Sequence, residues 1–338
     1  MTKMIAMAVT QGGAKMQRVE REIPTPGPRE VLIRVHACGV CHSDVFTVEG
    51  LFPGIAFPRV PGHEVIGRIE AVGAMVEGWK VGERAGVGWF GGSCGHCFRC
   101  RRGEAFACET IQSVTGITRD GGYATHMLAD VTAVAHIPDD LDDIGSAPLL
   151  CAGVTTFNAL RHGGAGTGDL VAILGVGGLG HLALQFAAHQ GYRTVAINRG
   201  RDKEAMARSL GAHDYIDSAV EDPAQALQKR GGAKVILATV TAADAVQSVL
   251  GGLGPNGTLM LIGAVSAFPI DPLAMIGKNS AVRGWYSGVA ADSEDTLRFC
   301  QLHHISPMNE IYPFEKAQEA YDRMKSGKAR FRVVLSMV

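Results

Sequence analysis

A glycine-rich segment between an apolar run and a helical pattern limits the fold of this chain more than any other feature. Residues 170–174 are wholly apolar, and the next six residues are Gly-Val-Gly-Gly-Leu-Gly. Apolar side chains then recur at helical spacing as far as Ala187. A buried strand, a G-x-G-x-x-G turn and an amphipathic helix, in that order, are typical of a dinucleotide-binding βαβ unit. The sequence therefore predicts a parallel sheet with helices packed on it.

The chain changes character near residue 151. Beyond it, apolar runs at residues 194–197, 235–238 and 258–262 alternate with helical patterns, as the buried strands of an α/β protein do. Before it, short segments such as residues 31–35 are separated by prolines and glycines and indicate a β-rich half. The last stretch predicts helices over residues 293–304 and 315–326 and a strand over residues 331–335. At about 100 to 200 residues per domain, 338 residues fit two domains.

The glycine-rich turn has a physical reason for each glycine. Gly175 permits the tight turn, Gly177 lets a pyrophosphate approach the backbone, and Gly180 allows the helix to pack closely on the strand. A phosphate would then lie at the helix N-terminus. The alternative is a glycine-rich turn that binds nothing, and it stays open here. The cofactor-binding candidates of this region are Gly175, Gly177, Gly178, Leu179, Gly180 and Lys203.

The end of the next strand bears on the choice of dinucleotide. An acidic residue there would bind the adenosine ribose of NAD, but the chain has Asn198-Arg199-Gly200-Arg201. A carboxylate would repel a 2′-phosphate, whereas an arginine pairs with one. We therefore expect NADP in preference to NAD, although Asn198 is also able to hydrogen-bond a ribose hydroxyl.

Four of the eight cysteines lie within fifteen residues of one another. Cys94, Cys97, Cys100 and Cys108 have the short spacings of a tetrahedral zinc site. Four thiolates leave no coordination position open, so the predicted role of this lobe, residues 91–109, is structural. A disulfide pair or free thiols are the alternative.

The arginines beside these cysteines raise a further alternative, a zinc finger that binds nucleic acid. Arg99, Arg101 and Arg102 supply positive charge, but 32 basic and 33 acidic residues give the chain a net charge of −1. No recognition-helix spacing follows the cysteines. We therefore expect no nucleic-acid partner, and we interpret the arginines as a solvated face of the loop.

A second set of metal-binding residue types is dispersed along the chain. Cys41 and Asp44 follow the first clear strand, His63 and Glu64 follow a proline turn, and Cys151 begins the second half. Two thiolates and one imidazole are a ligand set of catalytic zinc, with a fourth position left for water or substrate. Because Cys38 and Cys41 are also at metal-binding spacing, spacing alone does not choose between them.

No segment is apolar enough for a membrane span. The best candidate, residues 170–182, is interrupted by four glycines and His181, whereas a span needs about 20 apolar residues. The N-terminus lacks the features of an export signal. We therefore expect a cytoplasmic protein with reduced thiols and no membrane partner.

Taken together, these motifs resemble the zinc-dependent medium-chain alcohol dehydrogenases, a branch of the medium-chain dehydrogenase/reductase family, and the short microbial members above all. The likeness covers the whole chain. It implies a GroES-like, β-rich catalytic domain over residues 1–152, completed by residues 289–338, and a doubly wound Rossmann nucleotide-binding domain over residues 153–288. It also implies a homo-oligomer, dimer or tetramer.

The resemblance assigns roles to individual residues. Cys41, His63 and Cys151 match the catalytic zinc ligands, so Cys38 does not, and Glu64 matches a carboxylate near the metal that exchanges as a ligand. The remaining matches are Asp44 as the partner that orients His63, Ser43 as the hydroxyl that passes the substrate proton, His42 as a residue facing the cofactor pyrophosphate, and Arg332 as a C-terminal cofactor-binding arginine. Two zinc ions per chain follow, one catalytic and one structural.

The chain departs from this family at one position. Many relatives have a histidine five residues after the first zinc cysteine to complete a proton relay, and here the residue is Phe46. The expected reaction is reversible hydride transfer between an alcohol and NAD(P), giving an aldehyde or ketone. The alternatives are an NADPH-dependent aldehyde reductase of the cinnamyl-alcohol-dehydrogenase type and, from another class, an inactive zinc-stabilised nucleotide-binding protein.

Overall fold

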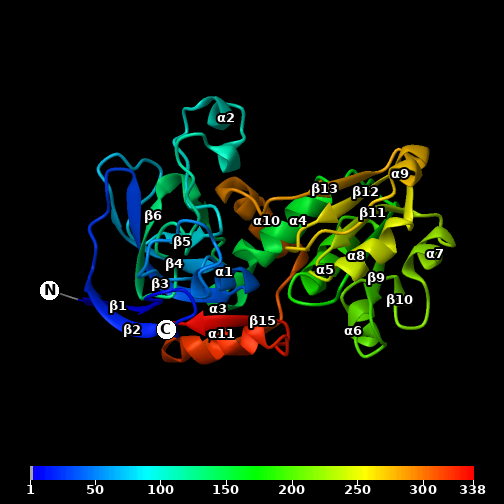
Figure 1. Cartoon of the computed structure of the whole chain (residues 1–338). Coiled ribbons are helices and arrows are strands. Elements are labelled where there is room, and N and C mark those ends of the chain that lie inside the picture. Colours follow the sequence, from blue (N-terminus) through cyan, green and yellow to red (C-terminus); the bar gives the residue numbers. More distant parts are fainter. Residues whose placement is uncertain (1–2) are drawn as a thin grey trace. The chain divides into compact units, whose positions relative to one another are not determined.

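The computed structural model describes residues 3–338, and the chain forms two compact units. One unit runs to Val154 and resumes as Gly288–Val338, and the other is Thr155–Ser287. The division therefore falls inside helix α4 (Ala152–Arg161). Each unit has its own sheet and is described separately below (Figure 1).

The discontinuous unit is built on two sheets that are antiparallel except for the parallel pair of β14 and β15. A two-stranded sheet pairs β1 (Lys3–Ala8) with β2 (Gln17–Glu22). A seven-stranded sheet has the order β14-β15-β3-β4-β5-β7, with β6 also paired to β3. Its strands are β3 (Glu30–Val40), β4 (Val65–Val72), β5 (Arg84–Val87), β6 (His126–Asp130), β7 (Val134–His136), β14 (Asn309–Pro313) and β15 (Arg332–Ser336).

The C-terminal strand completes this sheet. β15 pairs antiparallel with β3, so that Val333 lies opposite Val40. The strand expected over residues 331–335 is therefore present, one residue later at each end. The buried side chains of β3 and β15 join one apolar core with Tyr123, Phe314 and Tyr321. This core positions the end of β3, where the first candidate ligand lies.

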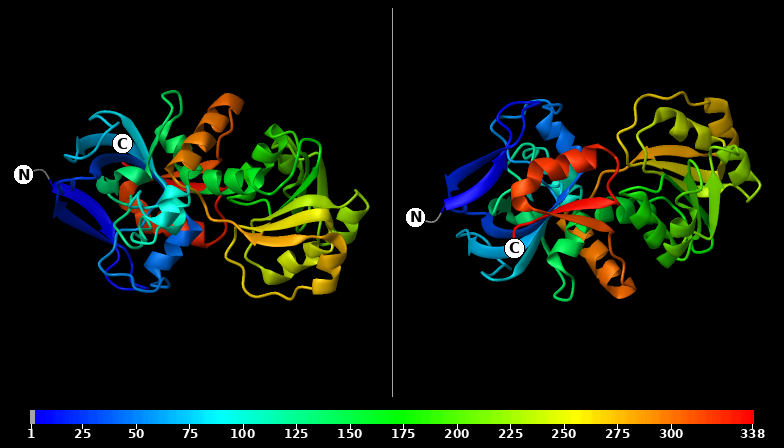
Figure 2. Two further views of the ribbon diagram at one scale, coloured as in Figure 1. Left: turned by 90° about the horizontal axis from the view of Figure 1, so that it is seen from above. Right: turned by 90° about the horizontal axis from the view of Figure 1, so that it is seen from below.

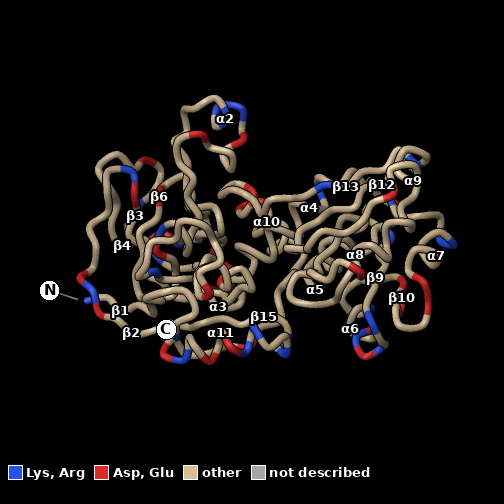
Figure 3. Tube along the Cα trace, viewed as in Figure 1, with Lys and Arg blue, Asp and Glu red and all other residues tan. Residues whose placement is uncertain are grey.

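The helices of this unit are short except for two. Both long helices follow residue 288, where the sequence predicts them, and α10 begins three residues earlier than expected. Charged residues of both signs follow α11 along its exposed side (Figure 3). The helices are α1 (Val45–Val48), α2 (Phe98–Arg101), α3 (Asp143–Ser146), α10 (Ala290–His303) and α11 (Ala317–Lys325).

The continuous unit is a six-stranded parallel sheet. Its order, β10-β9-β8-β11-β12-β13, starts in the middle with β8 and proceeds outward first in one direction and then in the other. This is the doubly wound order that the glycine motif predicts. Its strands are β8 (Leu170–Leu174), β9 (Arg193–Asn198), β10 (Asp214–Asp217), β11 (Ala233–Ala238), β12 (Leu253–Leu261) and β13 (Ala281–Gly284).

Helices lie on both faces of this sheet (Figure 2). Of its central strands, β8 is buried along its whole length and β11 at five of its six residues, which explains their apolar sequences. The helices are α5 (Gly180–His189), α6 (Glu204–Ser209), α7 (Pro223–Gln228), α8 (Ala243–Leu250) and α9 (Pro272–Lys278). Within residues 3–338, the structure has no helix with the length and apolarity that a bilayer span requires.

Candidate functional site

Three distant segments of the discontinuous unit bring four metal-binding side chains together. Cys41 follows β3 directly, His63 and Glu64 precede β4 directly, and Cys151 precedes α4 directly. One ligand atom from each of the four residues lies within 4.8 Å of the others. The Sγ atoms of Cys41 and Cys151, 110 positions apart in the chain, are 3.8 Å apart. We call these four residues the mixed cluster.

The mixed cluster is buried. The exposed fractions are 6% for Cys41, 1% for His63, 0% for Glu64 and 9% for Cys151. Ionised groups withdrawn from water in this way need partners that compensate their charge. The arrangement around the cluster supplies two such partners, Asp44 and Arg332.

Asp44 fixes the orientation of the His63 ring. The Nδ1 atom of His63 lies 3.1 Å from Asp44 Oδ1 and hydrogen-bonds to it. Nδ1 therefore holds a proton, which leaves Nε2 as the ring nitrogen available to a metal. Nε2 is buried and has no hydrogen-bond partner among residues 3–338. A buried imidazole nitrogen left in this state, with two sulfurs beside it, is what a bound zinc ion requires.

Arg332 pairs with Glu64 inside the unit. Its Nη2 donates to Glu64 Oε1, and both side chains are buried. The other carboxylate oxygen, Oε2, has no hydrogen-bond partner within the described chain. Burial raises the pKa of Glu64 to about 7, even though Arg332 acts in the opposite direction. Gly39 makes room for this carboxylate, because a Cβ atom there would lie 1.8 Å from Oε2.

The two cysteines of the mixed cluster influence each other strongly. The hydrogen bond from the Cys151 thiol holds the pKa of Cys41 well below its usual range, and the same bond raises the pKa of Cys151. Burial lowers the pKa of His63, but the negative charges of Asp44 and Cys41 outweigh burial and raise it overall. Two sulfurs, one imidazole and one carboxylate match the ligand preferences of zinc.

The remaining candidates of this unit lie close to the cluster or on the surface. The backbone N–H of Ser43 donates to Cys41 Sγ at 3.5 Å, and the Ser43 side chain is half-buried. His42 is exposed. Cys38 is fully buried and its thiol faces its own chain at Gly39 O, so it is packed in the core and is not one of the gathered ligands.

Aromatic side chains lie beside His63. The ring of Trp89 meets the His63 ring edge-on at 4.9 Å between centroids. Phe46 contacts Trp89 at 6.5 Å and Phe52 at 6.4 Å, both edge-on. The position that is a histidine in many relatives is therefore part of an apolar aromatic group, in which no side chain accepts a proton.

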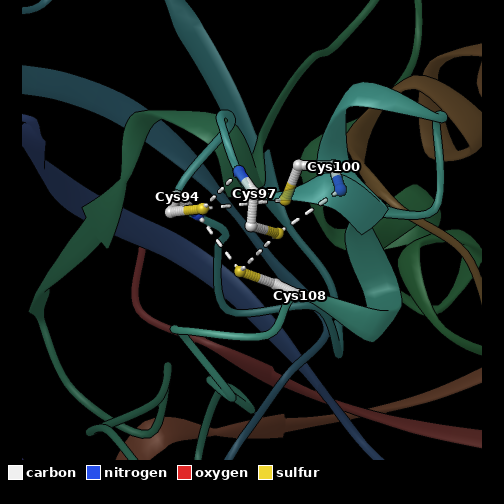
Figure 4. Close-up of side chains that lie close together, drawn as sticks. All are labelled: Cys94, Cys97, Cys100 and Cys108. Carbon is white, nitrogen blue, oxygen red and sulfur yellow. Dashed lines mark hydrogen bonds between the residues drawn. The ribbon is translucent and has the colours of Figure 1, made fainter.

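The four-cysteine lobe forms a second cluster from a single loop. The sulfurs of Cys94, Cys97, Cys100 and Cys108 face one another, and each offers a ligand atom within 4.8 Å of the others (Figure 4). Cys94 and Cys100 are 4.0 Å apart, as are Cys97 and Cys108. The chain turns back on itself at Gly95, where φ is +76°.

Backbone N–H groups point at these sulfurs. The amides of Cys97 and Ile111 donate to Cys94 and Cys108 respectively, each at 3.3 Å. Burial raises the pKa of Cys108, but the amide donors outweigh it and lower the pKa to about 5. The pKa of Cys94 is lowered to about 7, first by a hydrogen bond from Thr110. The loop therefore favours the thiolate, the form that binds zinc, at Cys94 and Cys108, whereas burial raises the pKa of Cys100 to about 11.

The arginines of the lobe are exposed and partly paired. Arg99 donates to Glu104 at 2.7 Å, and Arg102 lies over the exposed ring of Phe98. The helix between the cysteines, α2, has one turn only. It is too short to serve as a recognition helix, which agrees with the interpretation of these arginines as a solvated face.

In the continuous unit, the glycine turn has the geometry that its sequence implies. Gly175 has φ of +93°, which glycine adopts without strain. A Cβ atom at Gly180 would lie 1.8 Å from the oxygen of Gly175, so only glycine permits the close packing of α5. At Gly177 a Cβ atom would meet nothing within 4 Å. The space in front of Gly177 is therefore free for a ligand.

Side chains from the next strand and helix brace this turn. Asn198 Oδ1 accepts from the Val176 amide at 3.3 Å, and Lys203 Nζ donates to the Val176 oxygen at 2.7 Å. Arg199 is exposed. Asp217, at the end of β10, accepts from the amides of Gly200 and Ala219, so its carboxylate is already engaged. Sequence reasoning did not identify Asp217, and no motif marks it.

Comparisons with known proteins agree with this geometry. The family of alcohol dehydrogenase GroES-like domains matches residues 27–139, and the family of zinc-binding dehydrogenases matches residues 178–301. Alcohol dehydrogenase patD of Penicillium expansum is 46% identical over 325 residues, which cover 96% of this chain and 95% of that protein.

Two solved structures share the fold over nearly the whole length. The cobalt- and zinc-bound thermostable alcohol dehydrogenase from Pyrobaculum aerophilum has a TM-score of 0.88 and 27% identity, covering 99% of this chain and 100% of that one. CAD from Helicobacter pylori complexed with NADP(H) has a TM-score of 0.87 and 27% identity, covering 99% and 98%. These likenesses confirm the predicted fold class, a GroES-like domain with a Rossmann-like parallel sheet.

Proposed function

The chain belongs to the zinc-dependent medium-chain alcohol dehydrogenases, and from this premise we propose that it interconverts an alcohol with an aldehyde or ketone at the mixed cluster, with NADP as its cofactor. It is an oxidoreductase of small-molecule alcohols, and its family uses zinc and a nicotinamide cofactor. One observation supports the location above all: the buried Nε2 of His63, unpartnered within the described chain, lies among two cysteines and a carboxylate.

We assign the catalytic zinc to Cys41, His63 and Cys151, with Glu64 as an exchangeable fourth ligand. When bound, zinc acts as a Lewis acid toward the substrate oxygen, and the nicotinamide ring takes up or returns the hydride. The chain supplies the charge balance. Two thiolates offset a divalent cation, and Arg332 offsets Glu64, so the buried site carries little net charge.

The substrate proton leaves through Ser43 in this proposal. Its amide donates to Cys41 Sγ, which holds Ser43 next to the ligand set. The phenyl ring of Phe46 cannot accept the proton from Ser43. Onward transfer would then use a ribose hydroxyl of the cofactor, water or another group, and we expect the pH dependence of turnover to differ from that of relatives with a histidine at this position.

Residues 153–288 are proposed as the cofactor domain, and residues 1–152 with 289–338 as the catalytic domain. The open space at Gly177 and the amides at the start of α5 suit a pyrophosphate. His42 and Arg332 are assigned to the same cofactor in the proposal, Arg332 in addition to its pairing with Glu64.

The preference for NADP rests on charge at the end of β9. Asn198 is neutral, Arg199 is exposed, and the nearby Asp217 carboxylate is engaged by two backbone amides. A 2′-phosphate thus meets positive charge there. We expect kcat/KM to be higher with NADP than with NAD. The double variant Arg199→Ala, Arg201→Ala should lower the ratio of kcat/KM with NADP to kcat/KM with NAD. A higher value with NAD contradicts the preference.

The function is tested by metal content and turnover on the same preparation. We expect about two zinc ions per chain and alcohol-dependent reduction of NADP. A chain with zinc in the four-cysteine lobe only, or with no turnover on a panel of primary, secondary and aromatic alcohols and their carbonyl products, contradicts the proposal. The second outcome would favour the inactive nucleotide-binding protein.

A second candidate function is an NADPH-dependent aldehyde reductase of the cinnamyl-alcohol-dehydrogenase type. The aromatic group of Phe46, Phe52 and Trp89 beside His63 favours it, because flat rings pack well on aromatic side chains. Steady-state rates in both directions, with cinnamaldehyde and with short aliphatic aldehydes, distinguish the two.

A homo-oligomer, dimer or tetramer, is also proposed. β13 is an edge strand of the parallel sheet, and the neighbouring α9 exposes Leu273 and Ile276. Open edges and exposed apolar side chains are commonly covered by a second subunit. Light scattering after size exclusion gives the subunit number, and a monomer at all concentrations contradicts the proposal.

A further inference from the structure

A tyrosine outside the ligand segments also touches the environment of His63. The carboxylate of Asp44 is buried and accepts four hydrogen bonds. Its Oδ2 accepts from the Cys41 amide at 2.9 Å and from the Tyr123 hydroxyl at 2.8 Å. Its Oδ1 accepts from the Gly62 amide at 3.3 Å and lies 3.1 Å from His63 Nδ1.

These four donors fill the carboxylate. An ionised carboxylate has about four lone-pair sites, two on each oxygen, and here each oxygen has two donors. Three of the donors belong to the chain segments that provide Cys41 and His63 themselves. Tyr123 is the one donor that reaches Asp44 from elsewhere, so it ties the group to the rest of the unit.

The ring of Tyr123 supports the same loop by contact. It is fully buried, and a Cβ atom at Gly62 would lie 2.5 Å from its Cδ1. Gly62 has φ of +101°, so the loop turns sharply there and the ring occupies the space where a side chain would lie. The residue before His63 is thus held between the ring and Asp44.

The backbone around Tyr123 is joined to this loop as well. The amide of Tyr123 donates to Pro61 O at 3.0 Å, and the amide of Gly122 donates to Gly62 O at 3.0 Å. The hydroxyl therefore belongs to a segment that cannot move away from the loop without breaking several bonds. Because the Tyr123 ring is also fully buried, the fold fixes the position of its hydroxyl relative to Asp44.

We propose that Tyr123 is a positioning residue for the catalytic zinc: its hydroxyl fixes the Asp44 carboxylate, which in turn holds His63 with Nδ1 protonated and Nε2 directed at the ligand set. The inference rests on the proposed function, which assigns the mixed cluster to zinc. Without the hydroxyl, Asp44 Oδ2 keeps one donor, and because Asp44 is only 2% exposed, bulk solvent does not readily replace the other. The carboxylate then turns more freely, and His63 with it.

The test is zinc release from Tyr123→Phe, which keeps the ring and removes only the hydroxyl. A chromogenic chelator is added to the fully loaded protein, and release from the mixed cluster and from the four-cysteine lobe is followed as two phases. We expect zinc release from the mixed cluster to be about 10-fold faster, as is typical when a hydrogen-bond partner behind a metal ligand is removed. The rate of zinc release from the four-cysteine lobe should be unchanged. Cobalt placed in the mixed cluster should show a shifted visible absorption.

Tyr321→Phe is the matched control. Tyr321 is a buried tyrosine of the same unit, 2% exposed, whose hydroxyl donates to the Glu49 carboxylate at 3.1 Å. It loses the same kind of hydrogen bond, but to a carboxylate that is outside the ligand set, so zinc release from both sites should match the wild type. Thermal unfolding of both variants shows whether they are folded.

A double-mutant cycle with Asp44→Asn shows whether Tyr123 acts through Asp44. If it does, adding Tyr123→Phe to Asp44→Asn changes zinc release less than twofold. The inference is overturned if the effects of Tyr123→Phe and Asp44→Asn on zinc release are fully additive. It is also overturned if Tyr123→Phe releases zinc no faster than Tyr321→Phe, or if it accelerates release equally at both metal sites. A wild-type protein with one zinc ion contradicts the proposed function instead, so the two failures are distinguishable.

Discussion

The two metal clusters of this chain are built in opposite ways. The four-cysteine lobe takes all its sulfurs from positions 94 to 108, and two of them are half-exposed. The mixed cluster takes its ligands from three segments, of which the first and last are 110 positions apart, and its side chains are at most 9% exposed. One is a property of a loop, and the other is a property of the folded sheet.

Their ligand sets suit the two clusters to different tasks. Sulfurs alone, each supported by nearby amides, close the coordination of one ion and stabilise a loop. The mixed cluster combines an oriented imidazole, a carboxylate balanced by an arginine, and two sulfurs within hydrogen-bond distance of each other. Removing one ligand from each cluster should therefore have different consequences.

The largest effect is expected for His63→Ala. We predict a loss of activity of about 10³-fold or more, because a Lewis acid contributes several kcal/mol to the transition state and each 1.36 kcal/mol is a factor of ten. The lobe should keep its zinc, so metal analysis should show one ion per chain lost. Substitution of Cys151 by serine should give the same pattern. Full turnover by either purified variant would falsify the assignment of the mixed cluster.

Cys97→Ser should give the reverse pattern. Loss of the lobe zinc removes a local folding constraint, and we predict a fall in the melting temperature of about 10 °C. Activity of the folded fraction should stay within about threefold of the wild type, since this cysteine is absent from the mixed cluster. Calorimetry and turnover at low temperature measure the two effects. A loss of activity well beyond threefold in the folded fraction would mean that the two clusters are not independent.

Partial metal removal from the unaltered protein is the next comparison. A chelator should remove zinc first from the mixed cluster, where the proposal leaves one coordination position exchangeable, and later from the four closed thiolates. Activity should therefore fall with the first ion and unfolding should follow the second. Simultaneous loss of both would show that the lobe is not a closed site.

The smallest effect is expected at Asp143, a charged group outside both clusters. It pairs with His36 at 2.7 Å and with Arg84. Burial raises its pKa, but the hydrogen bond from His36 and the charge of Arg84 outweigh burial and lower it overall. The stability that a lowered carboxyl pKa provides is present when the pH lies above the ordinary pKa, which is 3.8 for Asp143. It is lost as the pH falls through the lower pKa of the folded state.

Asp143→Asn should therefore cost about 2 kcal/mol of unfolding free energy near pH 7 and much less near pH 3. Denaturant titrations of variant and wild type at both pH values give the difference. Both zinc ions should remain in the variant at neutral pH. If either is lost, disturbance of any buried charged group releases metal, and the comparison of the clusters loses its meaning.

Much of the fold was predictable because the responsible signals are local. The run at residues 170–174 coincides with β8, and the glycines after it have the φ angle and close contacts that their motif implies. The four-cysteine lobe is equally local. β10 and β13 were not predicted, because four-residue strands have no periodicity of their own and depend on the neighbouring strand.

The mixed cluster was less accessible to sequence reasoning. Spacing left Cys38 and Cys41 equivalent, and only the resemblance separated them. In the structure, Cys38 packs against Gly62 and Gly122, whereas Cys41 faces Cys151. Neither Tyr123 nor Gly39 was singled out. The GGY segment that contains Tyr123 was the only signal, and it does not say which carboxylate the hydroxyl meets.

Neighbouring residues alone specify the buried parallel strands, the glycine turn, the sulfur loop and the neutral residue at position 198. What the tertiary structure decided is which distant groups share a buried space, such as Asp44 with Tyr123 and Glu64 with Arg332. Hydrogen bonds and ion pairs form over a few ångströms in space, and only the folded sheet brings Cys41 to Cys151, Tyr123 to Asp44 and Arg332 to Glu64 within that distance.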